Sequence, residues 1–138
     1  MELEVDALLL NHGGIHARPA TALIDLIREA EFRYSVEIWA TNVGHDYKPI
    51  IPPTTLRCES SIDLMMLVAY QGCIVRFRIC GQHPKSAAAA IVDLVASGFH
   101  ACIEDSEYEK FVRNRREPPH ALMSEYLKLK YPDKYKGS

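Results

Sequence analysis

The chain of 138 residues lacks several features that would place it in a common protein class. No apolar run approaches the roughly 20 residues that span a bilayer, and the opening MELEVDALLL lacks the basic region of a signal peptide. The net charge of -2 provides no overall attraction to nucleic acid or to a membrane surface. We therefore expect a cytoplasmic protein with neither nucleic acid nor membrane among its partners.

Metal-binding and nucleotide-binding patterns are also missing. The four cysteines form no CxxC pair, and together with the scattered histidines they show no metal-ligand spacing. We expect no metal, and we expect reduced thiols rather than cystines. A GxxxxGK loop and a nucleophile elbow are both absent, which argues against a self-contained kinase or hydrolase.

What the chain does contain is an alternation of strand and helix patterns. The segments are, in chain order, a strand at 3–10, a helix at 17–30, a strand at 34–42, an extended segment at 43–58, a helix at 61–71, a strand at 73–80 and a helix at 84–98. Three prolines between residues 49 and 53 favour an edge strand or a protruding loop in the extended segment. The order βαββαβα predicts an α+β fold with helices on one face of a single sheet.

Two of these helices carry further signals. The first helix presents one apolar face, formed by Ala20, Leu23, Ile24 and Ile27. The second is preceded by Ser60, which with Asp63 three residues later fits a capping box. It is expected to run to Gln71, with Gly72 as its C′ residue.

The stretch GGIHARPA, residues 13–20, places a titratable ring and a fixed positive charge where the first helix begins. A helix N-terminus presents free backbone N–H groups and a partial positive charge, so it binds anions such as phosphate. His16 falls at or next to the N-cap, and Arg18 can reach the same anion with its forked donors. The helix end and Arg18 disfavour a charged imidazole, so His16 is expected to offer a neutral nitrogen that accepts a phosphoryl group.

A simpler interpretation of His16 stays open at this point. A histidine near a helix start is more often a cap or a plain surface residue. The complete order Gly-Ile-His-Ala-Arg-Pro-Ala, on a strand–turn–helix pattern, is far more specific than a histidine with one nearby glycine.

Three stretches of this sequence resemble one known family. GIHARPAT resembles the active-site signature of HPr, the histidine-containing phosphocarrier of the bacterial phosphoenolpyruvate-dependent sugar phosphotransferase system. SSIDLMMLVAYQG is similar to the second motif of that family, and CIVRFRICGQHPKSAAAAIVDLV is similar to its last strand and helix. The resemblance covers roughly residues 2 to 98. It implies an open-faced β-sandwich, in which a four-stranded antiparallel sheet carries three helices on one face.

The resemblance also implies a role for the first motif. His16 would accept a phosphoryl group on its δ nitrogen from phosphorylated enzyme I and pass it to a histidine of an enzyme II A-component. Arg18 would assist the transfer, and the backbone N–H groups of Ala17 and Arg18 would complete the anion site. The protein would be a carrier rather than an enzyme, working in sugar transport without metal or cofactor.

The second motif carries two further expectations from the same resemblance. Ser60 takes the place of the family's regulatory serine, which a kinase modifies in some bacteria, although Ser60 is also a good helix cap. Ile62 and Met65 match positions at which the family docks its partners. A core role is an equal alternative for each of these two side chains, because the helix has almost no polar face.

Two segments depart from the family pattern. We expect an HPr-like domain at 1–100 with an insertion near 45–57, followed by a C-terminal helical extension at 101–138. Four apolar residues of the extension are expected to pack on the carrier or on a partner: Phe111, Leu122, Tyr126 and Leu129. Its basic residues invite a nucleic-acid interpretation, but the acidic residues nearby favour a solvated helical face.

Two functional classes follow from these observations. The first is a phosphocarrier that feeds sugar uptake. The second is a regulatory member of the same family, whose phosphorylation state controls a binding partner. The insertion and the extension support the second, because a bare shuttle needs neither. We expect a phosphocarrier in either case, with transport as the preferred role and regulation as the alternative.

Overall fold

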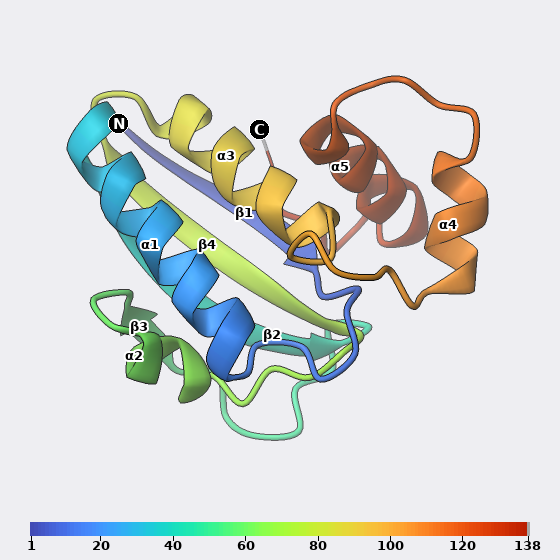
Figure 1. Cartoon of the computed structure of the whole chain (residues 1–138), viewed down its shortest axis with the longest axis horizontal. Coiled ribbons are helices and arrows are strands. Elements are labelled where there is room, and N and C mark those ends of the chain that lie inside the picture. Colours follow the sequence, from blue (N-terminus) through green and yellow to red (C-terminus); the bar gives the residue numbers. More distant parts are fainter. Residues whose placement is uncertain (138) are drawn as a thin grey trace.

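A single antiparallel sheet forms the centre of the computed structural model, which describes residues 1–137 (Figure 1). Its strands are β1 (Glu2–Leu8), β2 (Val36–His45), β3 (Thr55–Arg57) and β4 (Cys73–Gly81), in the spatial order β1-β4-β2-β3. Every pairing is antiparallel, and a β-bulge interrupts the β2–β4 register between Asn42 and Gly44. The predicted four-stranded open sheet is confirmed, with β3 as the edge strand of the proline-rich segment.

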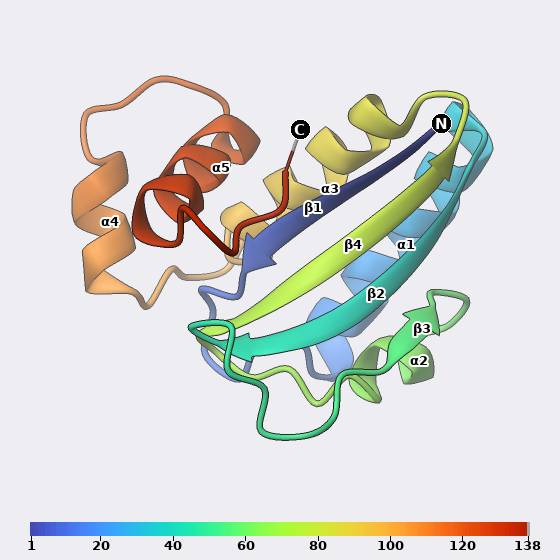
Figure 2. The ribbon, with the colours of Figure 1, turned by 180° about the vertical axis from the view of Figure 1, so that it is seen from behind.

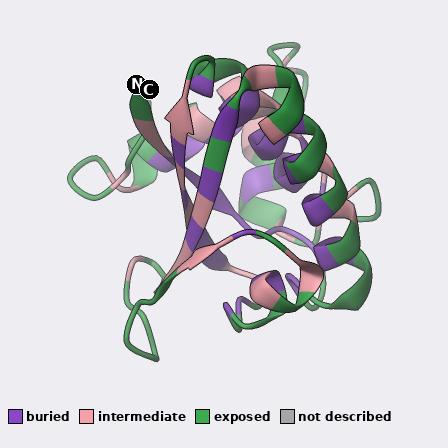
Figure 3. Ribbon diagram, turned by 90° about the vertical axis from the view of Figure 1, so that its left-hand side faces the viewer, coloured by how far each residue is buried: buried purple, intermediate pink, exposed green. Residues whose placement is uncertain are grey.

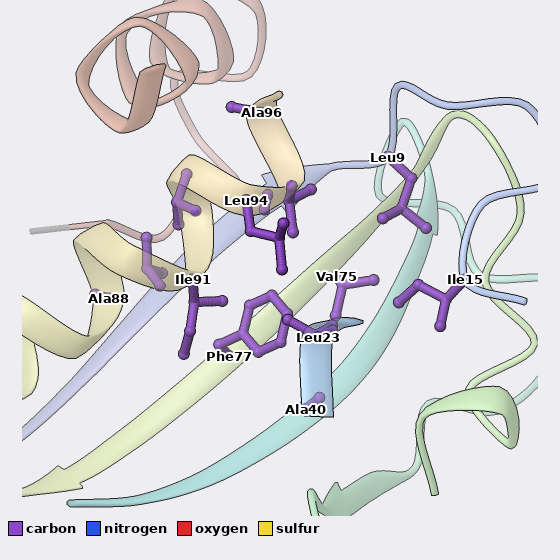
Figure 4. Close-up of a cluster of buried hydrophobic side chains, with 14 of the residues drawn as sticks. Leu9, Ile15, Leu23, Ala40, Val75, Phe77, Ala88, Ile91, Leu94 and Ala96 are labelled. Atoms are coloured by element: carbon purple, nitrogen blue, oxygen red, sulfur yellow. The ribbon is translucent and has the colours of Figure 1, made fainter. Parts of the chain in front are cut away.

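Three helices, α1 (Ala17–Tyr34), α2 (Ser61–Met65) and α3 (Pro84–Ala96), cover one face of the sheet. The alternating residues Val75, Phe77 and Ile79 of β4 point into this layer and are completely buried. In the close-up of the core, Phe77 lies between Leu23 of α1 and Ile91 of α3 (Figure 4). Seen from the side, buried residues recur along the strands and along the helices that pack on them (Figure 3).

Helix α1 buries the predicted apolar face and continues beyond the predicted end. Residues 20, 23, 24 and 27 are all buried. The helix extends to Tyr34 because Ser35 adopts a left-handed conformation (φ 53°) and its N–H donates to the Glu31 carbonyl, which closes the last turn. The sequence pattern obscured this last turn, because it places Phe32, which is 91% exposed, on the solvent side.

Helix α2 is shorter than predicted, and Gly72 is not its C′ residue. The capping box is present: the Ser60 hydroxyl accepts from the Asp63 N–H, and the Asp63 carboxylate accepts from the Ser60 N–H. The helix ends at Met65, and Val68 is left-handed (φ 51°). The chain uncoils because residues 67–71 contact other segments; the Ala69 carbonyl accepts from the Ile15 N–H at 2.9 Å.

The C-terminal segment folds into α4 (Ser106–Val112) and α5 (Pro119–Lys130) beside α3 and β1. Of the four residues expected to pack on the carrier or on a partner, Leu122 and Tyr126 are buried and Phe111 is half-buried. Leu129 does not pack on the domain, since its side chain is 69% exposed, so for this residue only the expected contact with a partner stays a prediction. Met123, on the inner side, is completely buried instead.

One buried carboxylate joins the insertion, the extension and the open face of the sheet. Asp6 of β1 has no exposed surface and accepts from Arg76 Nε (2.8 Å), from the Tyr47 hydroxyl (2.6 Å) and from the Lys136 N–H (3.0 Å). Its own N–H, on the free edge of β1, donates to the Lys136 carbonyl at 2.8 Å. The last described residues thus return to β1 (Figure 2) and cover part of its edge.

The aromatic rings reinforce this junction. Tyr47 of the insertion and Tyr131 of the extension meet edge to face, with ring centroids 5.1 Å apart, and Tyr131 donates to the Asp46 carboxylate. Burial and the hydrogen bond to Asp6 raise the pKa of Tyr47 well above its usual range. The insertion and the extension therefore contact each other as well as the sheet. None of the helices between residues 1 and 137 has the length and hydropathy needed to cross a bilayer.

Replacing Asp6 by Asn should destabilise the protein strongly. The substitution removes the buried charge opposite Arg76, and breaking a buried pair costs about 3–5 kcal/mol of the free energy of unfolding. Glu2→Gln is the matched control, because Glu2 forms an exposed pair with Arg78 across the same two strands. That change is expected to cost less than about 1 kcal/mol. Equal urea midpoints for the two variants would contradict a structural role of the Asp6 junction.

The packing of the extension is tested by truncating one inner and one outer residue of α5. Met123→Ala removes a completely buried side chain and should lower the free energy of unfolding by about 2–5 kcal/mol. Leu129→Ala removes an exposed side chain and should change it by less than about 0.5 kcal/mol. Thermal unfolding of both variants measures the difference; a neutral Met123→Ala would mean that α5 does not pack on the domain.

Candidate functional site

The connection between β1 and α1 is held against the sheet and against the segment after α2. The Leu9 N–H donates to the Cys73 carbonyl, and the Gly72 N–H donates to the Leu9 carbonyl. Ile15 points into the core (Figure 4), where it is buried, and its N–H donates to the Ala69 carbonyl at 2.9 Å. With Ile15 fixed inward, the next residue, His16, lies at the surface.

The two glycines of the connection are required for different reasons. Both adopt left-handed backbone conformations, with φ 81° at Gly13 and 62° at Gly14. A Cβ on Gly14 would lie 2.3 Å from the Ala69 carbonyl oxygen, so a side chain there would push the connection off the segment that holds it. A Cβ on Gly13 would lie 2.8 Å from Cδ2 of His16, so a side chain there would meet the imidazole ring.

Asn11 is a positioning residue that the sequence pattern did not single out. Its side chain is buried, and Nδ2 donates to the Gly14 carbonyl at 2.9 Å, which closes the turn across the two glycines. The Gly14 N–H donates back to the Asn11 carbonyl at 3.1 Å. An asparagine at the start of a glycine-containing turn commonly closes the turn with a hydrogen bond from its side chain. The sequence Asn-His-Gly-Gly at 11–14 contains this signal.

His16 is the N-cap residue of α1, as predicted. Its carbonyl accepts from the Ala20 N–H at 2.8 Å, while its side chain makes no capping hydrogen bond. The imidazole turns its Cδ2–Nε2 edge toward Gly13, at 2.8 and 3.2 Å from the position of a Cβ there. Nδ1 lies on the opposite edge of the ring, away from Gly13. The His16 side chain is exposed.

The first turn of α1 supplies hydrogen-bond donors next to this ring. The backbone N–H groups of Ala17 and Arg18 precede the first intrahelical bonds and have no acceptor among residues 1–137. The Arg18 side chain is exposed and forms neither a hydrogen bond nor an ion pair within the same residues. Pro19 follows in the first turn, where a missing N–H removes no helical bond. An anion at the mouth of α1 would thus meet free amides and a free guanidinium.

A hollow of about 470 Å³ adjoins His16 on the side of the linker that follows α3. The hollow is lined by the connection between β1 and α1, by the first turns of α1 and by residues 98–104. Among the lining residues are His16, Arg18, Pro19, Phe99, Ala101 and Cys102. Asn11 also lines it, and the Oδ1 atom of Asn11 is a buried acceptor without a partner among the described residues. His12 Nδ1 lies 3.4 Å from the Glu104 carboxylate at the rim.

The predicted residues of the second motif lie on the other side of α1. Helix α2 packs against α1, and the Arg28 guanidinium donates to the Glu59 carbonyl just before Ser60. Ile62 and Met65 are exposed, at 63% and 38%, so they do not belong to the core. Ser60 is half-buried, and its hydroxyl is engaged in the capping box. The structure thus brings His16, Ala17 and Arg18 together, with Ile62 and Met65 outward on the neighbouring helix.

The described residues contain no group of three or more His, Cys, Asp or Glu side chains suited to a metal ion. The chemistry that this arrangement offers is that of an exposed imidazole beside a ready anion site.

Residues 4–97 match the family model described as the PTS HPr component phosphorylation site. The chain belongs to the HPr family. The match ends just after α3, so the linker from residue 98 onward, α4 and α5 lie outside it.

Solved HPr structures share the fold. The crystal structure of HPr-C-His from Thermoanaerobacter tengcongensis is 26% identical, with a TM-score of 0.56, and the alignment covers 72% of this chain and 98% of that one. The phosphocarrier protein HPr from Bacillus anthracis str. Ames is 18% identical, with a TM-score of 0.54 and coverage of 68% and 96%. The histidine-containing phosphocarrier protein of Mycoplasma is also 18% identical, with a TM-score of 0.54 and coverage of 74% and 99%. No curated protein matches the chain.

Substitution of the two glycines should separate the fold of the connection from the orientation of the ring. Gly14→Ala is expected to lower the free energy of unfolding by more than about 1–2 kcal/mol, because the left-handed backbone and the Ala69 carbonyl both oppose a Cβ. Gly13→Ala should cost only about 1 kcal/mol, since the ring can rotate away, but it should shift the ring resonances of His16. Urea unfolding and NMR of the imidazole measure the two effects. Unchanged ring resonances in Gly13→Ala would contradict the close contact.

Proposed function

We propose that this protein is a phosphocarrier that accepts a phosphoryl group on Nδ1 of His16 from phosphorylated enzyme I and passes it to an enzyme II A-component. The observation that carries the proposal is the place of the exposed imidazole at the N-cap of α1, with its Nδ1 edge away from Gly13 and the free amides of Ala17 and Arg18 beside it. Membership of the HPr family supports the same chemistry.

In the proposed transfer, the lone pair of Nδ1 attacks phosphorus as the bond between phosphorus and the donor atom of enzyme I breaks. The electron pair of the broken bond stays on the donor. The anionic oxygens of the migrating group then meet the N–H groups of Ala17 and Arg18 and the positive end of α1, which stabilise them without rearrangement. Arg18 adds forked, charged donors. In the second transfer, a histidine nitrogen of the A-component attacks phosphorus and the N–P bond to His16 breaks. The electron pair of that bond returns to Nδ1, so His16 is restored.

Docking of the two partners is assigned to the apolar patch formed by Ile62, Met65 and Met66 of the α2 segment. All three side chains are exposed, although each would be stabilised by burial. Methionine adapts to more than one apolar surface, which suits a protein that must contact a donor and an acceptor in turn. The patch lies on the helix that packs against α1, so a protein seated on it would reach His16.

The proposal is tested by phosphorylation with enzyme I of the same organism and phosphoenolpyruvate. The wild-type protein should acquire an acid-labile, base-stable phosphate, and His16→Ala should acquire none. Arg18→Ala should fold normally but transfer about tenfold more slowly, because it loses a charged donor that the migrating group meets in transit. His12→Ala is the matched control, since His12 is a neighbouring exposed histidine outside the proposed anion site. Label that persists in His16→Ala would refute the proposed acceptor.

A regulatory HPr-like protein, whose phosphorylation state controls a binding partner, is the second candidate. The ordered contacts of the insertion and the extension around Asp6 favour it, because a shuttle needs neither addition. Transfer from phosphorylated protein to an A-component supports the transport role. Retention of the label, with capture of a partner by only one of the two phosphorylation states, supports regulation.

Ser60 is the proposed second modification site, by resemblance to the regulatory serine of the family. Its hydroxyl accepts from the Asp63 N–H at 3.3 Å, and the Asp63 carboxylate faces the same N-cap. A phosphate on this hydroxyl would lie between Asp63 and Glu59, and their charges would repel it. Modification of Ser60 would therefore open the capping box and loosen α2, which would couple it to the apolar patch of that helix.

A further inference from the structure

The linker that follows α3, residues 98–104, forms one wall of the hollow beside His16, the proposed phosphoryl acceptor. Phe99, Ala101 and Cys102 line the hollow of about 470 Å³ together with His16 and Arg18. The family match ends at residue 97, so these residues lie outside the matched part of the chain. Most of the lining is apolar, because it comes from alanines, Pro19 and Phe99.

The linker is held in place by specific contacts and is not a loose connection. The Glu104 N–H donates to the Leu10 carbonyl at 2.8 Å, and Gln71 Nε2 donates to the Glu104 carbonyl at 2.7 Å. Three consecutive residues, Gly98, Phe99 and His100, are left-handed (φ 65°, 58° and 61°), which turns the chain sharply at the end of α3. Phe99 is thereby half-buried against the core. The hollow is thus bounded by fixed elements on both sides.

The segment after α2 contacts both the connection that leads to His16 and the linker. The Ala69 carbonyl accepts from the Ile15 N–H, and Gln71 Nε2 donates to the Glu104 carbonyl. His16 itself lines the hollow, so a protein that exchanges a phosphoryl group with this residue approaches the surface that borders the hollow.

We infer that the hollow is a contact surface for the phosphoryl-exchanging partner, which inserts an apolar side chain between α1 and the linker at Phe99, Ala101 and Cys102. The inference rests on the proposed function, and it adds a surface outside the matched family domain. The lining is mostly apolar, so burial in the hollow stabilises an apolar side chain of the partner. The exposed guanidinium of Arg18 and the carboxylate of Glu104 lie at the rim, where they remain hydrated. The linker would therefore select among partners.

Filling the hollow tests this inference. Ala101→Phe places a ring in it, and Ser86→Phe places the same ring on an exposed position of α3 outside the hollow. With enzyme I and phosphoenolpyruvate, Ala101→Phe should be phosphorylated at least about tenfold more slowly than wild type, and Ser86→Phe should stay within about twofold. Phosphoramidate is a small phosphoryl donor that needs no protein docking surface. It should label His16 of the wild type, Ala101→Phe and Ser86→Phe at equal rates.

The outcomes separate this inference from the proposed function. Failure of enzyme I to phosphorylate the wild-type protein would refute the proposed function and the inference with it. Phosphorylation of Ala101→Phe at the wild-type rate would overturn the inference alone. Equal slowing of Ala101→Phe with enzyme I and with phosphoramidate would also overturn it, because the defect would then lie at the ring of His16 itself.

Cysteine labelling provides an independent test without any substitution. Cys102 is exposed in the hollow, and Cys80 is half-exposed on β4, outside the hollow. Cys58 and Cys73 are buried, and burial raises the pKa of the Cys58 thiol to about 12, so neither should react with iodoacetamide at neutral pH. Saturating enzyme I should slow labelling of Cys102 about tenfold and leave Cys80 unchanged. Equal labelling of Cys102 with and without enzyme I would overturn the inference. Protection of Cys102 by self-association of the carrier alone would do the same.

Discussion

The hydrogen bond from the Ile15 N–H to the Ala69 carbonyl fixes the geometry on which the site depends. It ties the connection before α1 to the segment after α2 and holds the Ile15 side chain in the core. His16, the next residue, therefore lies at the surface, at the N-terminus of α1. Asn11 closes the turn that leads to it, and Gly14 leaves room for the contact, since any side chain there would meet the Ala69 carbonyl. The same bond holds the segment after α2, which leaves the helix at Met65 and turns through the left-handed Val68.

The additions to the family domain are built onto it at two places. At the β1 edge, the Asp6 carboxylate accepts hydrogen bonds from Arg76, from Tyr47 of the insertion and from Lys136 of the tail. The insertion and the tail therefore contact the same buried charge. At the other place, Glu104 of the linker donates its N–H to the Leu10 carbonyl of the connection between β1 and α1, and its carbonyl accepts from Gln71. The first contact stabilises the fold, and the second shapes the surface next to His16.

Much of the fold could be predicted from the sequence because local patterns decide it. The alternation of β4 and the apolar face of α1 are periodic signals, and the GGIHARPA stretch joins turn residues to a helix start. The position of His16 at the N-cap followed from the same signals. The end of helix α2 could not be predicted, because its apolar run has no polar face to mark an end and the segment that follows it bonds to Ile15, far away in sequence.

The remaining features are long-range contacts that no local pattern encodes. Asp6 is a polar residue in an alternating strand, and its burial depends on Arg76, Tyr47 and Lys136, which come from distant parts of the chain. The linker wall depends on a hydrogen bond between Leu10 and Glu104, residues far apart in the chain. The sequence does not indicate that α5 packs on the domain through Met123 and Leu127 and leaves Leu129 exposed. Helical spacing alone does not determine which stripe of a short helix faces the domain.

The central claim is that Nδ1 of His16 bonds to phosphorus while the first amides of α1 hold the phosphoryl oxygens. Heteronuclear NMR of the protein, labelled with ¹⁵N and phosphorylated by phosphoramidate, tests it most directly. The account predicts a two-bond ¹H–¹⁵N pattern of a ring substituted at Nδ1, together with downfield shifts of the Ala17 and Arg18 amide protons. A ring substituted at Nε2, or amide protons of Ala17 and Arg18 that do not move, would contradict it.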